Sequence, residues 1–585
     1  MDKVNITING RELEVPSNYT VLKAAEENGI YIPRLCFIEG IHEESNCRVC
    51  AVEIEGQKTL KNSCKMPIQD GMVVKTKNDR VTSAVRQNLE LTAANHTFEC
   101  WKCIREHNCE FLDLLRLYNV DNTIGEDQDY EKKERILTTS SDTIVLDSGK
   151  CTLCGRCISA CSKQSGLDIL AFNKRGSETT VGPANMHSME DSGCIYCGKC
   201  IQACPVAAIH EVDGVIQTTK SLNDEERFTV VMAAPSVRTA LGEEFGMPIG
   251  TNVEGRMYAA FKELGFDDIC DVNFGADLTI LEEGTEFINR LQGNGKFPMF
   301  TSCSPGWIRY IEQYAPEFLD NLSSCKSPQQ MTGAVIKSYW AKKLNIDPKT
   351  IDVVSVMPCI AKKNEANRPM MEVDGIRDVD IVITTREFAR LLKRNRIDLN
   401  KLEDFKPEGL LAQFTGAGNI FGATGGVMEA ALRTVVEVLE ERELEKLDFE
   451  VVRGIKDIKE ATLNVAGTDV NIAVVHGGTA IKEFMEIVKS GEKTYHFVEF
   501  MGCTGGCVNG GGQPILPSYV YEKIDVRAER AKVLYDEDNA MTLRKSHESP
   551  AVKAVYDEFF TKPGSHEAHK YLHTTYNKKE FYHED

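Results

Sequence analysis

The chain has 585 residues, a formal net charge of −20 at pH 7, and 42% hydrophobic and 27% charged residues. This length exceeds what one hydrophobic core can hold, and the composition is typical of packed domains, so we expect several globular domains rather than a disordered chain. The negative charge disfavours nucleic acid and membranes as partners, and the lack of a signal-type or membrane-length apolar run predicts a cytoplasmic protein.

The first segment predicts a small sheet with one helix, in which two strands meet at the turn Asn9-Gly10: Val4–Ile8, Glu12–Val15, then a helix over Val21–Asn28. Four cysteines follow in loop-like sequence: Cys36, Cys47, Cys50 and Cys64. Disulfides are rare in a reducing cytoplasm, so metal ligation is the better explanation. Four thiolates suit a [2Fe–2S] cluster, although their spacing differs from the plant ferredoxin pattern, and zinc is the alternative.

A histidine opens the second ligand group, which consists of His96, Cys100, Cys103 and Cys109. Imidazole and thiolate can share one iron–sulfur cluster or one zinc ion, so these residues alone leave the metal open. His107 is a second candidate histidine in the same stretch.

The third group gives the strongest local signal, because the bacterial ferredoxin spacing occurs twice: Cys151, Cys154, Cys157, Cys161 and Cys194, Cys197, Cys200, Cys204. In that pattern three cysteines hold one [4Fe–4S] cluster and the fourth reaches the other cluster. Pro205 follows the second run as the pattern asks, whereas Ser162 follows the first. We therefore expect two neighbouring [4Fe–4S] clusters and, with the earlier groups, a chain of one-electron carriers.

From about Phe228 onward, apolar runs alternate with helical patterns, which predicts an α/β fold with largely parallel sheets. The expected strands are Phe228–Met232, Phe297–Thr301, Val353–Met357, Val379–Thr384, Ile472–Val475 and Phe497–Met501, and helices are expected over Arg386–Arg394 and Gly426–Glu441.

Cysteines stand just beyond three of these strands: Cys303 in TSCSPGW, Cys359 in VMPCIAKK, and Cys503 with Cys507 in FMGCTGGCVNGGG. Sites in open α/β sheets gather outside the carboxyl ends of strands, so these thiols are expected to converge. Cys270 and Cys325 are instead interpreted as buried apolar thiols.

The motifs TSCSPGW, MPCIAKKNEA and MGCTGGCVNGGGQP resemble the three signature loops of iron-only hydrogenases, and the resemblance extends over nearly the whole chain. It implies a multidomain α/β and α+β protein like the large monomeric clostridial enzymes. Its parts are a β-grasp [2Fe–2S] ferredoxin domain (1–78), a [4Fe–4S] domain with one histidine and three cysteine ligands (79–125), a two-cluster ferredoxin domain (126–215) and an α/β catalytic domain (216–585). The resemblance selects His96 as an iron ligand.

The resemblance also implies the catalytic cofactor, an H-cluster in which a [4Fe–4S] cubane is linked to a two-iron unit bearing carbon monoxide, cyanide and a bridging dithiolate. One [2Fe–2S] and three accessory [4Fe–4S] clusters accompany it. Cys359, Cys503 and Cys507 are the implied cubane ligands, with Cys507 as the bridge. Lys362 and the turn around Ser236 would hold cyanide. The pocket lining would be Ala234, Pro235, Met357, Pro358, Phe421 and Met501.

By resemblance, protons pass from Cys303 to Glu283, Ser323 and Glu286. From the residues alone, the glutamates of ILEEGTEF (Glu282, Glu283 and Glu286) would instead be interpreted as the solvated face of a helix.

One loop departs from the family pattern, which reads TSCCP where this chain reads TSCSP. Ser304 then stands in the cubane-ligand position and Cys303 remains the relay. Three alternatives are open: the serine oxygen ligates iron, the cubane has three thiolates, or Cys303 ligates and Ser304 inherits the relay.

The implied activity is reversible production or oxidation of H₂, with protons as co-substrate, ferredoxin or flavodoxin as electron carrier, and maturation enzymes that install the cofactor. A hydrogen sensor is an alternative, but no signalling domain is visible after Gly477. Another is an electron-transfer subunit like the iron–sulfur subunit of respiratory NADH dehydrogenase, although a pure relay needs no MPC or GGCVNGGG loop.

Overall fold

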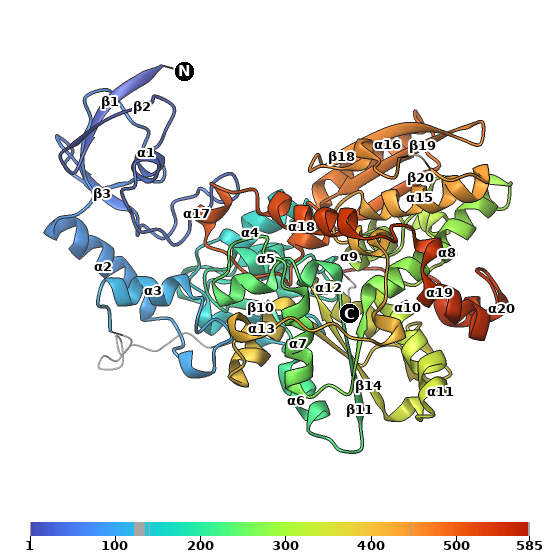
Figure 1. Ribbon diagram of the computed structural model, residues 1–585. Helices are drawn as coiled ribbons and strands as arrows, with labels where there is room; N and C mark the ends of the chain where they lie inside the picture. Colours follow the sequence, from blue (N-terminus) through green and yellow to red (C-terminus); the bar gives the residue numbers. More distant parts are fainter. Residues whose placement is uncertain (1, 122–134, 140, 445, 583–585) are drawn as a thin grey trace.

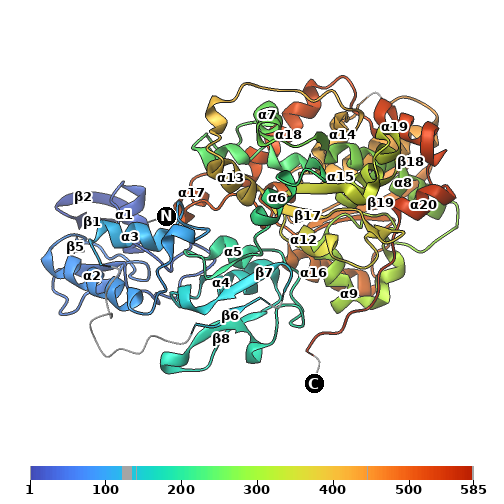
Figure 2. The same ribbon diagram turned by 90° about the horizontal axis from the view of Figure 1, so that it is seen from below.

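The computed structural model describes residues 2–121, 135–139, 141–444 and 446–582. Figure 1 shows the N-terminal segment as an arm beside a much larger body, and Figure 2 shows helices α4 (Arg156–Ala160) and α5 (Lys199–Ala203) between the two. The predicted multidomain architecture is confirmed. The expected boundary between residues 125 and 126 lies outside the described residues.

The N-terminal domain contains a five-stranded sheet in the order β2-β1-β5-β3-β4, with the β1–β2 hairpin antiparallel and β5 parallel to β1. Alternate residues such as Ile6 and Leu13 enter the core that α1 covers. Thr20 caps α1 by accepting a hydrogen bond from the Lys23 amide, which explains where the helix begins. The bounds are β1 Lys3–Ile8, β2 Arg11–Pro16, α1 Val21–Glu27, β3 Ala51–Ile54, β4 Lys61–Asn62 and β5 Val73–Lys75.

Helices α2 (Asp79–Ala93) and α3 (Glu110–Leu117) lead into the cysteine-rich middle of the chain. There, α4 (Arg156–Ala160) and α5 (Lys199–Ala203) each start after a left-handed glycine, Gly155 (φ 83°) and Gly198 (φ 74°). The repeated cysteine runs therefore fold into two similar turns that face each other. The strands here are β6 Leu137–Thr138, β7 Ile144–Asp147, β8 Leu170–Asn173, β9 Thr180–Pro183 and β10 Ile209–Glu211.

The rear body contains two four-stranded sheets. The first, in the order β12-β11-β14-β17, is entirely parallel, and in the second, β13-β20-β19-β18, only β18 is antiparallel. All six expected strands occur, whereas β12 and β18 were not predicted. The bounds are β11 Phe228–Ala233, β12 Asp268–Asp271, β13 Met299–Phe300, β14 Ile351–Met357, β17 Ile381–Thr384, β18 Ile458–Val465, β19 Thr468–His476 and β20 Phe497–Met501, and a small hairpin joins β15 Glu372–Val373 and β16 Ile376–Arg377.

Helix α8 (Val272–Leu291) lies at the centre of this body, against α10, α14 and α15. It is buried on several sides, and Glu282 and Glu283 are each only 1% exposed. The interpretation of these two glutamates as a solvated face is therefore wrong. The other helices are α6 Val215–Leu222, α7 Glu254–Leu264, α9 Pro305–Tyr314, α10 Pro328–Val335, α11 Ala341–Leu344, α12 Ala361–Ala366, α13 Thr385–Arg394, α14 Gly416–Ile420, α15 Gly426–Glu440 and α16 Gly478–Ser490.

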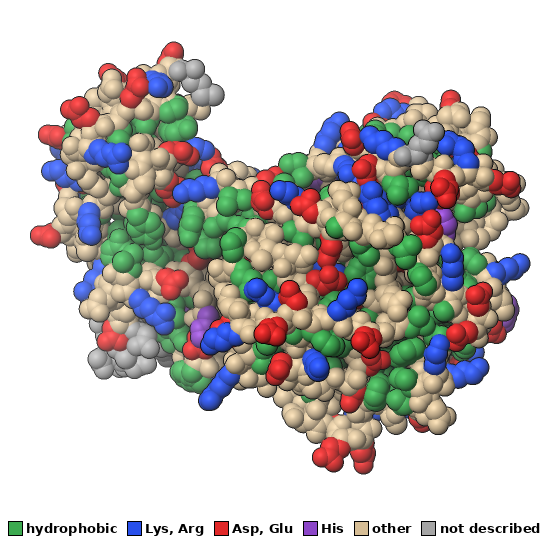
Figure 3. Space-filling model, in the orientation of Figure 1, with side chains coloured by type: hydrophobic (Ala, Val, Ile, Leu, Met, Phe, Trp, Pro, Cys, Tyr) green, Lys and Arg blue, Asp and Glu red, His purple; other side chains and the backbone are tan. Residues whose placement is uncertain are grey.

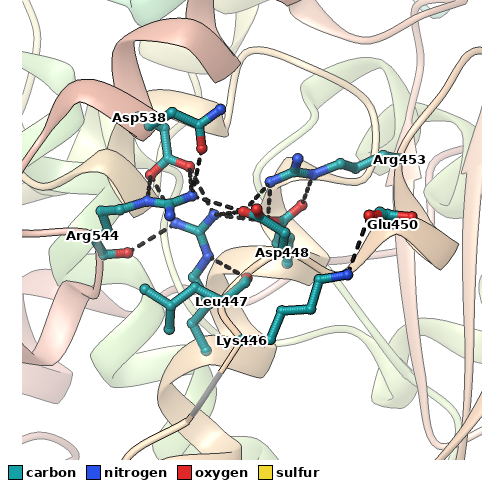
Figure 4. Close-up of polar contacts among 10 residues, drawn as sticks. Lys446, Leu447, Asp448, Glu450, Arg453, Asp538 and Arg544 are labelled. Atoms are coloured by element: carbon teal, nitrogen blue, oxygen red, sulfur yellow. Dashed lines mark hydrogen bonds and ion pairs between the residues drawn. The ribbon is translucent and has the colours of Figure 1, made fainter.

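The C-terminal segment wraps back over the body through α17 (Ser518–Tyr521), α18 (Val526–Ala540), α19 (Pro550–Val555) and α20 (His566–Leu572). A polar network joins it to α15 (Figure 4). Asp538 accepts hydrogen bonds from Arg433 and Arg544, and Arg544 also reaches Asp448 at 2.8 Å. Arg433 and Asp538 are both buried, so each charge is compensated by its partner where water cannot reach.

Within the described ranges, no helix is long and apolar enough to cross a membrane. The space-filling view shows acidic and basic side chains mixed over the visible face (Figure 3).

Candidate active site

The first four cysteines lie together between the loop after α1 and the β3–β4 hairpin. Cys50 and Cys64 approach to 3.3 Å between their sulfur atoms, and Cys36 lies beside Cys47. The Cys47 hydrogen bond and burial raise the pKa of the Cys36 thiol, so without a metal this thiol holds a proton that a metal would displace. The arrangement suits a small metal cluster with four thiolate ligands.

The second group lines one cavity, which contains His96, Cys100, Cys103 and Cys109. His96 is 8% exposed, and burial lowers its pKa to about 4, so its imidazole is neutral near pH 7. Its Nδ1 has no hydrogen-bond partner within the described part of the chain. A neutral imidazole with a free nitrogen is what metal ligation requires. His107, in contrast, is 74% exposed.

The two ferredoxin-type runs exchange their fourth cysteines. Cys204 lies with Cys151, Cys154 and Cys157 around one cavity. Burial raises the pKa of Cys157, and Cys154 and Cys204 are the next two causes. Cys161 likewise acts on Cys200 from the other run, after burial, Cys197 and Cys194. The result is two groups of four thiols, each of which fits one cubane cluster.

The rear thiols converge beyond the carboxyl ends of β14 and β20. Burial raises the pKa of Cys359, and Cys503 and Cys507 are its next two causes, which places the three thiols near one another. Cys503 also raises the pKa of Cys197, after burial and Cys161, so this site adjoins the second ferredoxin-type group. Where they meet, a Cβ added to Gly198 would lie 2.8 Å from the Gly511 backbone, so only glycine allows this approach.

Buried apolar residues surround these thiols. Phe421 and Met501 belong to the core cluster that Cys303 and Cys507 contact, and Ala234 and Met357 belong to the neighbouring core. Pro235 and Pro358 are buried beside them. Gly506 has φ 90°, and a Cβ there would lie 2.6 Å from the Thr424 amide nitrogen. The surroundings of these thiols are thus apolar, and tight backbone contacts fix them in place.

Two polar groups reach this apolar region. Lys362 donates hydrogen bonds to the Cys303 carbonyl at 3.1 Å and to Glu365 at 2.8 Å, and it is almost fully buried. Ser236 lies in the turn η6 (Pro235–Val237), where Gln513 donates to its carbonyl at 2.8 Å. Both are positioned by groups that the sequence patterns did not identify, Glu365 and Gln513.

A row of polar side chains runs from Cys303 toward the surface. Burial raises the pKa of the Cys303 thiol, with Glu283 as the next cause. Burial, followed by the charge of Glu286, raises the pKa of Glu283 to about 8, although the Ser323 hydroxyl and the Ser302 backbone act to lower it. Ser323 donates to Glu286 at 3.2 Å.

Glu286 forms the outer end of this row. It accepts from Arg290 at 2.6 Å and from the Ser324 hydroxyl at 3.1 Å, and it lines a surface cavity with Asn289 and Lys296. Sequence reasoning missed Arg290, Ser324 and His573, and only the i, i+4 spacing of Glu286 and Arg290 could have signalled one of them.

Ser304 and Cys303 point to different neighbours. The Ser304 hydroxyl accepts a hydrogen bond from the Gly502 amide at 3.0 Å, next to Cys503, whereas the Cys303 thiol lies near Glu283 and Lys362. Ser304 occupies the N-cap position of α9, yet it makes no side-chain hydrogen bond to that helix.

Models of known protein families match four parts of the chain. Their descriptions are a 2Fe-2S iron-sulfur cluster binding domain (residues 1–79), a 4Fe-4S dicluster domain (143–205), the C-terminal domain of the iron only hydrogenase large subunit (227–511) and the iron hydrogenase small subunit (524–579).

Relatives match over nearly the full length. Iron hydrogenase 1 of Clostridium pasteurianum is 44% identical over 98% of this chain and 100% of its own length. The NADP-reducing hydrogenase subunit HndD of Solidesulfovibrio fructosivorans is 41% identical over 99% of this chain and 100% of its own length. A solved structure of the [FeFe]-hydrogenase HydA1 from Chlamydomonas reinhardtii is 36% identical with a TM-score of 0.57, and the match covers 63% of this chain and 99% of that one.

Proposed function

The chain belongs to the iron-only hydrogenase family, and from that premise we propose that it reversibly interconverts H₂ with protons and electrons, using ferredoxin or flavodoxin as its electron carrier in the cytoplasm. As a member of this family it is an oxidoreductase of hydrogen metabolism with iron–sulfur domains and an H-cluster. Two observations carry the proposal: Cys359, Cys503 and Cys507 lie near one another, and Cys303 lies near both Cys507 and the buried acid Glu283.

In this proposal Cys359, Cys503 and Cys507 would hold the cubane, and Cys507 would be the bridging ligand to the two-iron unit. When bound, the H-cluster supplies the iron centre at which H₂ is made or split. Lys362 and Ser236 orient its polar ligands, and the lining residues Ala234, Pro235, Met357, Pro358, Phe421 and Met501 exclude water. Exclusion of water strengthens every charge interaction in the pocket.

Cys303, Glu283, Ser323 and Glu286 carry protons between this pocket and the surface cavity. With a pKa of about 8, Glu283 holds its proton near neutral pH and is poised to exchange it. Ser323 links onward by its hydrogen bond to Glu286, which faces the cavity. The row crosses protein interior that would otherwise block protons.

Electrons travel through the front thiol groups. We assign one [2Fe–2S] cluster to Cys36, Cys47, Cys50 and Cys64, and three [4Fe–4S] clusters to His96 with its cysteines and to the two exchanged groups. The chain of accessory clusters reaches the rear site where Cys197 lies near Cys503. The domain limits 1–78, 79–125, 126–215 and 216–585 follow this division.

In the TSCSP loop, which departs from the family pattern, we take Cys303 as the relay and place Ser304 in the cubane-ligand position. The Ser304 hydrogen bond to Gly502, beside Cys503, supports it, as does the proximity of Cys303 to Glu283. The redox potential of the cubane, compared between the parent and Ser304→Cys, decides whether the serine oxygen ligates iron or the cubane has three thiolates.

A second candidate concerns the electron partner. Because a full-length relative is named an NADP-reducing hydrogenase subunit, this chain would in that case exchange electrons with another subunit rather than with free ferredoxin. Turnover of the purified chain with reduced ferredoxin distinguishes the two.

The test is infrared spectroscopy of protein matured with its maturation enzymes, together with H₂ evolution. Bands from iron-bound carbon monoxide and cyanide and H₂ evolution are expected, and both should be lost in Cys507→Ala. Cys270→Ala, which removes a buried thiol outside the site, is the matched control and should keep both. Matured protein without these bands would revive the simple electron-transfer alternative, and bands with very slow turnover would favour the sensor.

A further inference from the structure

A separate set of metal-ligating side chains lies at the outer end of the polar row. Glu286, Cys325 and His573 each offer a ligand atom within 4.8 Å of the other two. Cys325 is fully buried, and the other two side chains are partly buried. We propose that these three residues form a binding site for a thiophilic divalent cation such as Zn²⁺.

The backbone brings the thiol and the imidazole together. Cys325 and His573 form an antiparallel bridge, flanked by hydrogen bonds from Lys326 N to Leu572 O and from Thr574 N to Ser324 O, both 2.8 Å. Residues between two such bonds form a non-hydrogen-bonded pair, whose side chains leave the same face and approach closely. The buried thiol therefore has a fixed partner 248 residues away in sequence.

Carboxylates lie on both sides of the imidazole, Glu286 as a ligand and Glu282 as an outer partner. Glu286 comes from α8 and is joined to His573 through the Ser324 hydroxyl, at 3.1 Å to Glu286 and 2.8 Å to His573 Nδ1. Glu282, one helical turn earlier, lies 3.0 Å from His573 Nε2. Sulfur, nitrogen and carboxylate oxygen in one set match the preference of Zn²⁺ and disfavour Ca²⁺ and Mg²⁺.

The charges around the site favour a cation. The buried Cys325 sulfur lies within 4.8 Å of a Glu286 carboxylate oxygen, so a thiolate there is unfavourable without a cation. A divalent cation removes that penalty and makes the thiolate a ligand. Arg290 holds the other oxygen of Glu286 at 2.6 Å.

Outer partners hold Glu282 in place and, through it, the ligand His573. The Tyr556 hydroxyl donates to Glu282 at 2.5 Å and the Gly564 amide donates to it at 2.8 Å. Such second contacts orient ligands before a metal arrives. The ligands also come from both matched regions, since Glu286 and Cys325 lie in the large-subunit part and His573 in the small-subunit part. A bound ion would tie the two together.

The location gives the ion a consequence, which rests on the proposed function. Glu282, Glu286 and His573 line the surface cavity, so an ion can enter from solvent. Once held by Glu286, it would occupy the group through which the proposed relay exchanges protons with water. Binding would therefore inhibit turnover reversibly without touching the H-cluster.

The experiment exposes matured enzyme to a few equivalents of Zn²⁺ without oxygen, removes free metal, and measures zinc per chain, zinc X-ray absorption and dye-linked H₂ evolution. We expect one retained zinc with one sulfur ligand, at least a tenfold loss of turnover, and recovery with EDTA. His573→Gln should raise the Zn²⁺ concentration for half-inhibition at least tenfold, and Cys325→Ala should remove the sulfur signal. His566→Gln, at a side chain that is 94% exposed nearby, is the control and should behave like the parent.

The outcomes separate the site from the relay. No retained zinc, or equal retention in His573→Gln, overturns the site. If zinc binds at this site and turnover stays full, although Glu286→Gln slows turnover, the inference that the ion inhibits the relay is overturned. If zinc binds there and neither zinc nor Glu286→Gln affects turnover, the site stands and the relay of the proposed function fails. Unchanged iron content and infrared bands exclude displacement of cluster iron.

Discussion

Glu283 is the residue at which activity and stability are expected to oppose each other. Burial, with Glu286, raises its pKa from 4.5 to about 8, so the folded protein keeps the proton at pH 7 while the unfolded chain releases it. One pKa unit corresponds to about 1.4 kcal/mol, so the free energy of unfolding at pH 7 is lowered by about 3 kcal/mol.

Glu283→Gln keeps the shape and removes the titration. Since the folded-state pKa lies above the unfolded value, the parent's stability is fully present below pH 4.5 and declines as pH rises toward 8. The variant should therefore gain stability over the parent by about 1.4 kcal/mol per pH unit in that window, and the gain should level off above it. Turnover should fall by roughly two orders of magnitude or more, because an amide cannot pass the proton.

The assay pairs dye-linked H₂ evolution with the thermal midpoint of the catalytic domain from pH 5 to 8.5, at one scan rate, with infrared bands to verify the cofactor. Glu282→Gln is the matched control, because Glu282 is equally buried but hydrogen-bonded to Tyr556, Gly564 and His573, so its loss should destabilise. Near-normal turnover of Glu283→Gln, or a stability difference that does not vary with pH, would refute the reasoning.

Three further outcomes are expected. Cys204→Ser should remove the electron paramagnetic resonance signal of the cluster held by Cys151, Cys154 and Cys157, and loss of the other cluster's signal would contradict the exchange of fourth cysteines. Deletion of residues 1–125 should slow ferredoxin-linked turnover and spare dye-linked turnover, because electrons enter through the front clusters; equal loss with both donors would count against the wire. Ser304→Cys should add a thiolate beside Cys503 and so raise iron retention or shift the cubane signal, whereas unchanged iron, signal and turnover would remove Ser304 from the ligand position.

The strands that could be predicted best are those in which every residue is buried, because they form continuous apolar runs in the sequence. Phe497–Met501 is buried at every residue, and its predicted bounds are those of β20. Strand β12 reads DICD, and the edge strand β18 reads IKEATLNV, with charged and polar residues between the apolar ones, so neither stands out as an apolar run. Among the cysteines, the local spacings indicated which thiols gather at the front.

The polar parts of the site could not be predicted from local pattern. LEEGTEF has the composition of a surface helix, and Glu282 is buried only because Tyr556, Gly564 and His573, which lie more than 270 residues away, satisfy it. Cys325 was interpreted as an apolar core thiol, which its burial agrees with, but its pairing with His573 exists only in the folded chain. Because these contacts join residues that are far apart in the sequence, they leave no periodic pattern from which the site could be predicted.

In the proposed assignment Ser304 stands in the ligand position, and its surroundings suit either serine or cysteine. Its hydroxyl satisfies the Gly502 amide, a bond that a thiolate there would also accept, so the loop next to Cys503 needs no rearrangement. The two alternatives for the cubane therefore predict opposite shifts of its redox potential relative to Ser304→Cys. A deprotonated serine oxygen is a harder donor than sulfur, favours ferric iron and makes the cubane potential lower than in Ser304→Cys. A neutral hydroxyl leaves the cluster one negative charge short in a buried site, where charge interactions are strong, and makes it higher. Potentiometric titration of the two proteins therefore decides between alkoxide ligation and three thiolates.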